Sequence, residues 1–260
     1  MNHSNIDLLD LSNEILLIIL KKLDNIDVLY SLCGINNERL DILLQDDIFI
    51  NTLNLVSISS TIDHLKLDRF CIYILPRICH FVKKFIIETI SMERILLAGD
   101  YSKLTYLELF NFKQDIIYRY FTYAPAVQHI FKHKIADLIL HNNDKYTRKT
   151  LTRVYTRNVY APILVFFQNL KNLIIVASSE NDYPPLSIYD LPLSTFYSST
   201  ITLLQINVYN FHDCISLLDG RLEQLTTFIV QVHRIRKLFS VSNNMVSSFY
   251  VVLLLIQAKE

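Results

Sequence analysis

Apolar residues near the start of the chain recur at the spacing of a helix. Ser12 can cap such a helix, and Glu14 lies in its first turn, where the helix dipole favours an anion. Ile15, Ile19 and Leu23 follow at positions i, i+4 and i+8, which places them on one helix face. The pattern therefore predicts a first helix that begins after Ser12.

Two more short helices are expected before residue 50. Asp27 can cap the second, which would end at Gly34, a residue suited to the left-handed position after a helix. Asn36 or Asn37 can begin the third. Three short helices with tight connections predict a small bundle.

The first helix contains more apolar residues than such a bundle can bury. Leu16, Leu17, Ile18 and Leu20 lie between the residues of the regular face and point to other sides of the helix. A helix that is apolar all round must be covered on more than one side. The cover is either the rest of the chain or another protein, and the sequence leaves both open.

From residue 50 onward, a six-residue pattern recurs in which the first, fourth and sixth positions are apolar. Its copies begin at Ile50, Ile62, Val82, Leu104, Ile135, Leu170, Ile201, Leu225 and Val246. From the second copy on, they start 20 to 35 residues apart, which resembles the period of leucine-rich repeats. We therefore predict an irregular, leucine-rich-repeat-like α/β solenoid with a mostly parallel sheet. An irregular α/β domain with such a sheet is the alternative fold.

Composition indicates an ordered protein with two differently charged parts. Hydrophobic residues make up 51%, and there are only 3 glycines and 6 prolines, which argues against disorder. Residues 1–50 hold nine acidic and three basic residues, a formal charge of 3 − 9 = −6, so the rest of the neutral chain carries +6. This break predicts a boundary between residues 6–50 and 51–260. Overall neutrality argues against a nucleic-acid binder.

Neither secretion nor a membrane anchor is expected. The first ten residues, MNHSNIDLLD, lack the basic segment of a signal peptide, and the longest apolar run, FYVVLLLI at 249–256, is far shorter than the roughly 20 residues that cross a bilayer. The protein is therefore predicted to be intracellular, in the cytoplasm, the nucleus or both. Its cysteines should be reduced, buried thiols: Cys33, Cys71, Cys79 and Cys214.

No motif in the sequence predicts a catalytic, cofactor or metal site. Gly34, Gly99 and Gly220 are too far apart to form a phosphate-binding loop. His129 and His133 share a helix face, but the Glu of a metalloprotease helix and a third ligand are missing. An enzyme whose site is formed by dispersed residues is the weaker alternative.

One stretch of the chain is strongly basic. Lys145, Lys149, Arg153 and Arg157 lie at successive i+4 positions, with Arg148 beside them. If this segment is helical, these residues form a basic stripe opposite Leu151, Val154 and Tyr155. The stripe is either a contact for an acidic or phosphorylated substrate or a solvated outer face.

The segment LDLSNEILLIILKKLDNIDVLYSLCGINNERLDILLQDDIF resembles the F-box pattern. The matching positions are Leu11 with Ser12, Glu14, Ile15, Leu16, Leu23, Asp27, Val28, Leu29, Cys33, Asn36 and Arg39. The matching residues follow the order of the family pattern over about 40 residues. Ser12 stands where the family usually has Pro, and the chain has no Trp to close the module.

The resemblance implies a substrate receptor without catalysis of its own. In such proteins the box binds the Skp-family adaptor of a cullin-RING ubiquitin ligase, and the repeats bind a target protein. The implied adaptor contacts are Leu11, Ser12, Ile15, Leu16, Leu29, Leu32 and Cys33. A repeat scaffold whose degenerate box no longer binds an adaptor is the alternative.

Overall fold

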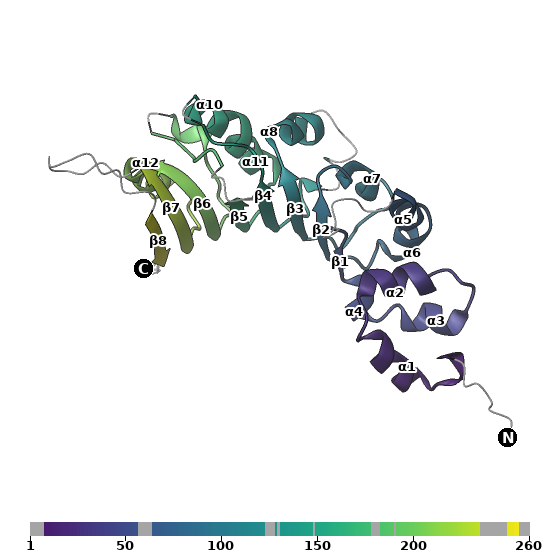
Figure 1. Ribbon diagram of the computed structural model, residues 1–260. Coiled ribbons are helices and arrows are strands. Elements are labelled where there is room, and N and C mark those ends of the chain that lie inside the picture. The colour runs from purple at the N-terminus through teal and green to yellow at the C-terminus, as the bar shows by residue number, and fades with distance from the viewer. Residues whose placement is uncertain are drawn as a thin grey trace, which may run out of the picture. The chain divides into compact units, whose positions relative to one another are not determined.

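The computed structural model describes residues 8–56, 64–122, 128, 131–147, 149–177, 183–189, 191–234 and 249–254 (Figure 1). The chain divides into two compact units. Unit 1 comprises Met1–Ile87 with Arg94–Leu104, and unit 2 comprises Glu88–Glu93 with Thr105–Glu260. The boundary predicted at residue 50 falls inside unit 1, where the N-terminal helices contact the elements that follow them.

Unit 1 begins with short helical segments: η1 (Leu8–Asp10), α1 (Asn13–Leu20), α2 (Asn25–Leu32), α3 (Glu38–Leu43) and α4 (Asp47–Ile50). The three predicted helices are present. The expected cap of α2 is wrong, because the carboxylate of Asp24, and not that of Asp27, accepts backbone N–H bonds from the first turn. Asn37 caps α3, and Gly34 takes the left-handed conformation after α2 with φ +80°, as predicted.

The remainder of unit 1 combines two strands with helices: β1 (Thr52–Asn54), α5 (His64–Arg69), η2 (Phe70–Ile74), α6 (Leu75–Ile78), β2 (Lys84–Glu88) and α7 (Met92–Leu96). Strands β1 and β2 pair in parallel. The strand predicted at Ile62 is wrong, since its described part, from His64 on, is helix α5. Only residues 56–61 separate this copy from the one before, whereas a crossover between parallel strands needs about a dozen residues.

Unit 2 contains the other strands: β3 (Tyr106–Phe112), β4 (Asp137–Asn142), β5 (Asn172–Ala177), β6 (Leu203–Asn210), β7 (Thr227–Arg234) and β8 (Phe249–Leu254). They are neighbours in chain order, and each pair from β3 to β7 is parallel. Strand β8 is antiparallel to β7, so the expectation of one more parallel strand from the copy at Val246 is wrong. The broader expectation of an α/β fold with a mostly parallel sheet is confirmed.

The recurring six-residue pattern builds the core on one face of strands β3–β7. In the five copies from Leu104 to Leu225, no side chain at the first, fourth or sixth position is more than 2% exposed. Each strand starts at the third position of its copy, so the third and fifth side chains point to the opposite face of the sheet. Burying an aliphatic side chain contributes about 1.5–3 kcal/mol, which explains why these positions determine the strands.

The backbone between neighbouring copies also repeats. The carbonyl of Thr105, at the second position of its copy, accepts hydrogen bonds from the N–H groups of Ala136 (2.8 Å) and Asp137 (3.0 Å). The carbonyl of Lys171 does the same for Thr202 and Leu203, at 2.8 and 3.0 Å. Each strand of these pairs therefore begins in the same register as the one before it.

Helical segments connect the strands of unit 2: α8 (Gln114–Ile116), η3 (Ile117–Thr122), α10 (Thr152–Tyr155), η4 (Thr156–Tyr160), α11 (Ala161–Phe166), η5 (Leu193–Thr195) and α12 (Phe211–Leu217). In Figure 1, α8, α10, α11 and α12 lie on one side of strands β3–β7. Segments η3 and η4 are π-helical. None of the helices in the described ranges combines the length and apolar character needed to cross a membrane.

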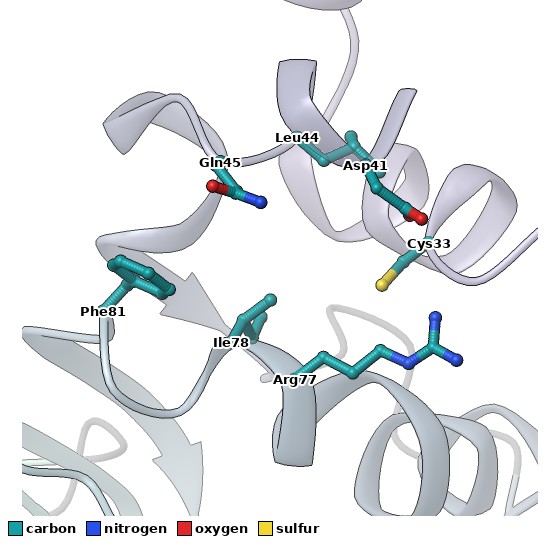
Figure 2. A pocket seen from close by; sticks show the side chains of 7 residues that line it. All are labelled: Cys33, Asp41, Leu44, Gln45, Arg77, Ile78 and Phe81. Atoms are coloured by element: carbon teal, nitrogen blue, oxygen red, sulfur yellow. The ribbon is translucent and has the colours of Figure 1, made fainter. Parts of the chain in front are cut away.

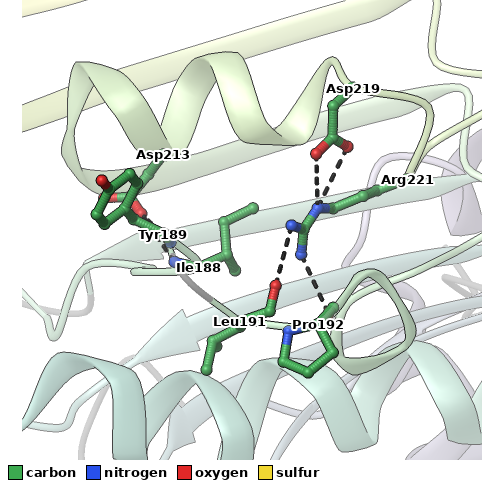
Figure 3. A network of polar contacts seen from close by, with 7 residues as sticks. All are labelled: Ile188, Tyr189, Leu191, Pro192, Asp213, Asp219 and Arg221. Carbon is green, nitrogen blue, oxygen red and sulfur yellow. Dashed lines mark hydrogen bonds and ion pairs between the residues drawn. The ribbon is translucent and has the colours of Figure 1, made fainter.

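Two buried charged residues hold the segment that precedes η5 (Figure 3). The Asp213 carboxylate, fully buried, accepts hydrogen bonds from the N–H groups of Ile188 (2.8 Å), Tyr189 (3.0 Å) and Asn210 (3.1 Å). The guanidinium of Arg221 donates to the carbonyls of Leu191 (3.1 Å) and Pro192 (3.3 Å) and pairs with Asp219 at 3.2 Å. These contacts satisfy backbone groups that lie outside regular secondary structure.

Candidate functional site

Helix α1 presents an apolar surface. Ile15, Ile18 and Ile19 lie at i, i+3 and i+4, and their side chains are 49%, 61% and 38% exposed. The face that α1 buries is formed by Leu16 and Leu20, and not by the regular series of Ile15, Ile19 and Leu23. The surplus of apolar residues is therefore left at the surface of unit 1, and we call Ile15, Ile18 and Ile19 the α1 face.

The predicted adaptor contacts divide into surface and core residues. Ser12 and Ile15 are exposed, Leu11 and Leu32 are half-buried, and Leu16, Leu29 and Cys33 are buried within unit 1. Sequence reasoning gave no contact role to Ile18 and Ile19, although both are exposed beside Ile15. The excess of apolar residues in this helix indicated that some of them stay exposed, but the pattern did not show which apolar residues the chain itself buries.

Arg39 positions the start of α1. Its guanidinium donates to Asn13 Oδ1 (2.6 Å), to the carbonyl of Leu9 (2.7 Å) and to the carbonyl of Leu11. A single side chain of α3 thus holds the segment that leads into α1 by charge-assisted bonds. Arg39 is one of the positions that match the F-box pattern, and this contact gives it a structural role.

Ser12 is the N-cap residue of α1, as predicted, with extended backbone angles of φ −64° and ψ 159°. Its side chain accepts no capping bond from the backbone. The pKa of Glu14 is lowered, first by a hydrogen bond from its own backbone N–H and then by one from the Ser12 side chain. The first turn of α1 therefore favours the ionised form of Glu14.

The basic stripe is not formed, because residues 144–158 are not one helix. Lys145 and Lys149 lie in the loop before α10, Arg153 lies on α10 and Arg157 on η4, all four with exposed side chains. Arg148 lies outside the described residues. The predicted apolar side is wrong as well, since Leu151 and Val154 are exposed and Tyr155 alone is buried.

Buried polar contacts explain why the loop replaces a helix. The hydroxyl of Tyr155 donates to Asp144 Oδ2 (2.6 Å) and accepts from the Asn142 side chain (2.9 Å). Asp144 Oδ2 also accepts from the N–H of Gln114 (2.8 Å). Burial raises the pKa of Asp144, against the lowering effect of these hydrogen bonds. These tertiary hydrogen bonds hold the residues before α10 in a loop, which the helical spacing of the basic residues did not predict.

The face of the unit 2 sheet opposite α8, α10, α11 and α12 carries a polar and aromatic cluster that sequence reasoning missed. Glu108 Oε1 lies 2.7 Å from His141 Nε2, and Glu108 Oε2 accepts from the hydroxyl of Tyr106 at 2.7 Å. The ring of Phe110 stacks on His141 with centroids 3.7 Å apart. Burial, followed by the Glu108 hydrogen bond, raises the pKa of Tyr106. Tyr106 and Glu108 occupy the third and fifth positions of their copy, and Phe110 and His141 continue the same alternation in their strands. The repeated pattern could therefore have identified this surface.

A second aromatic cluster lies where β6 and β7 end. His233 makes an edge contact with Tyr146, with ring centroids 4.6 Å apart, and stacks with Tyr209 at 6.4 Å. The hydroxyl of Tyr209 accepts a hydrogen bond from Arg234 at 2.8 Å. Because Tyr146 follows Lys145 directly, the basic loop lies at the same end of the sheet as this cluster.

The cysteines are free and buried, as predicted. Burial raises the pKa of Cys71 and of Cys214 to about 11, so both thiols stay protonated at neutral pH. Among the described residues, no three His, Cys, Asp or Glu side chains gather as metal ligands would. His133 is exposed, and His129 lies outside the described residues.

The arrangement of these surfaces favours binding to other proteins: an apolar helix face in unit 1, and a polar and aromatic sheet face with a basic loop in unit 2. Comparison with known proteins gave no match to any family model, to any curated protein or to any solved structure.

Proposed function

We propose that the chain is the substrate-receptor subunit of an SCF-type cullin-RING ubiquitin ligase. Residues 6–50 act as an F-box that binds the Skp-family adaptor, and residues 51–260 act as a leucine-rich-repeat-like solenoid that binds a target protein. The chain itself is not an enzyme and works inside the cell, in the cytoplasm, the nucleus or both. It binds neither nucleic acid nor membrane, and it needs no cofactor.

The observation that carries the proposal is the α1 face. Three isoleucines exposed together on one short helix are costly in water unless a partner covers them. They lie in the segment that matches the F-box pattern, and Arg39, from the same pattern, holds the start of this helix. An adaptor that covers the α1 face accounts for both the exposure and the sequence match.

The repeat part of the proposal is supported by the order of strands in unit 2. Five parallel strands in chain order, with matching buried positions and helices on one side, are what a strand-helix solenoid requires. The sheet face opposite these helices, with the cluster of Tyr106, Glu108, Phe110 and His141, is the target-binding surface of this proposal. The loop that holds Lys145 and Lys149 flanks it and suits acidic or phosphorylated groups.

The adaptor is expected to co-purify with the full chain after co-expression, and a cullin to join through it. Ser12→Pro should hold or strengthen this complex, because Ser12 has φ −64°, close to the angle of about −65° that Pro imposes. Size-exclusion chromatography of the mixture measures the complex. A folded wild-type chain that forms no complex, and that Ser12→Pro does not rescue, leaves the scaffold with a degenerate box as the function.

Charge reversal in the basic loop is expected to weaken target capture. Lys145→Glu combined with Lys149→Glu replaces two exposed cations by anions, so capture of an identified target should fall in a salt-sensitive way, while adaptor binding stays unchanged. Lys132→Glu combined with Lys171→Glu is the charge-matched control in the same unit. Pull-down at several salt concentrations is the measurement, and equal capture by both double variants would make the basic loop a solvated surface only.

A further inference from the structure

Unit 1 contains a cavity of about 260 Å³ whose lining includes no residue of the α1 face (Figure 2). Helices α2 and α3 supply one side of it, and α6 with the following turn supplies the other. Leu44, Ile78 and Phe81 form its apolar wall, and Figure 2 shows their side chains and that of Gln45 around a common space. The volume lies below the range of about 300–1,000 Å³ for drug-sized ligands, so it suits a smaller molecule.

Two opposite charges stand at one end of this cavity. Figure 2 shows the Asp41 carboxylate and the Arg77 guanidinium on either side of the Cys33 sulfur. Burial raises the pKa of the Cys33 thiol, while Arg77 lowers it and Asp41 raises it further, which places both charges within electrostatic reach of the sulfur. Within the described part of the chain, Asp41 and Arg77 form no ion pair with each other or with another residue.

The Arg77 guanidinium lies close to Gly34. A Cβ atom at residue 34 would lie 2.7 Å from Arg77 Nη1, and Gly34 has φ +80°, so no other residue fits there without strain. The guanidinium therefore packs against bare backbone just after the end of α2, with Cζ and both Nη atoms nearest to residue 34, and a hydrogen bond from Arg77 lowers the pKa of the Cys33 thiol.

We propose that this cavity binds a free α-amino acid with an apolar side chain of about the size of leucine. Arg77 donates two parallel hydrogen bonds to the α-carboxylate, a group whose geometry matches the guanidinium fork. Asp41 accepts from the α-ammonium group. Leu44, Ile78 and Phe81 cover the side chain, which gains from leaving water. A zwitterion meets both unpaired charges at once, which a simple carboxylate or a simple amine does not.

Titration calorimetry of the full chain with L-leucine tests this proposal and requires no adaptor. Saturable binding is expected, at least tenfold tighter than binding of 4-methylpentanoate, which lacks the ammonium group, or of isoamylamine, which lacks the carboxylate. Glycine should bind at least tenfold more weakly than leucine, because it leaves the apolar wall in contact with water. Absence of saturable leucine binding, or equal binding of either analogue, overturns the proposal.

Two substitutions locate the site. Arg77→Met and Asp41→Asn should each weaken leucine binding at least tenfold, since each removes one charge and nearly preserves side-chain size. Lys22→Met, which removes an exposed cation that does not line the cavity, is the matched control and should leave binding unchanged. Circular dichroism checks that each variant is folded. Unchanged binding by folded Arg77→Met would place leucine elsewhere, and the analogue series on the wild-type chain decides the outcome if a variant does not fold.

Discussion

Replacing Ile15 and Ile18 together by Ala is expected to weaken the complex with the Skp-family adaptor at least about thirty-fold. Both side chains are about half or more exposed on the α1 face, so their truncation removes apolar contacts from the proposed interface without emptying the core of unit 1. Truncating central anchors of an interface typically costs about 2 kcal/mol or more, which corresponds to this factor. Titration of the purified adaptor against the full chain measures the dissociation constant.

Ile72→Ala is the matched control, because Ile72 is exposed in unit 1 but lies on η2, outside the segment that resembles an F-box. It should leave adaptor binding unchanged. The double variant should melt near the wild-type temperature, whereas a change at the buried Leu16 would confound binding with folding. If the folded double variant binds the adaptor as tightly as the wild type, the α1 face is not the interface.

Asp213→Ala is expected to lower the free energy of unfolding by about 3 kcal/mol or more. The change leaves three N–H groups without their acceptor: that of Ile188, which is buried, and those of Tyr189 and Asn210, which are partly buried. An unsatisfied buried polar group costs about 1–3 kcal/mol, and charge-assisted bonds stand at the upper end of that range. Urea denaturation followed by circular dichroism measures the loss. Asp115→Ala, at an exposed acid in α8, should cost less than about 1 kcal/mol. Losses of similar size in the two variants would contradict the role of Asp213.

The same site predicts a pH dependence with a defined sign. Burial raises the pKa of Asp213, while backbone hydrogen bonds from Tyr189, Ile188 and Asn210 oppose that rise. Protonation of this carboxyl therefore favours the folded state. Its contribution is fully present below the unfolded value of about 3.9 and is lost as the pH rises through the folded pKa. Relative to Asp213→Asn, which does not titrate, the wild type should lose stability as the pH rises from about 4, and a gain over this range would contradict the assignment.

The strands could be predicted from the sequence because their apolar pattern is short and repeated. Eight of the nine copies led to strands where they were expected, since burying the fourth and sixth positions requires an extended backbone with alternating faces. The copy at Ile62 did not form a strand, because the chain between it and the preceding copy is too short for a crossover between parallel strands. The apolar pattern itself contains no information about the length of that connection. Only the direction of β8 was predicted wrongly, because the alternation of apolar and polar residues is the same in a parallel and an antiparallel strand.

Helix boundaries were predictable where a single residue determines them. Gly34 ends α2 with a positive φ and Asn37 caps α3, and both follow from local chemistry. For α2 two aspartates, Asp24 and Asp27, lie within one turn of each other, and local preference did not distinguish the cap from the residue in the first turn. Only the structure shows that Asp24 is the cap.

By itself, the sequence determined the α/β class, the short N-terminal helices, the buried cysteines and the positions that form the sheet core, because each depends on local spacing and on burial of apolar side chains. Only the tertiary structure decided which face of α1 stays exposed, since a helix that is apolar all round has no preferred side until neighbours pack on it. It also decided that the basic residues near Lys149 lie in a loop and on two helical segments, because the bonds between Tyr155 and Asp144 join residues that helical periodicity does not relate. The cavity beside Arg77 likewise required α2, α3 and α6 to be brought together, which no local pattern encodes.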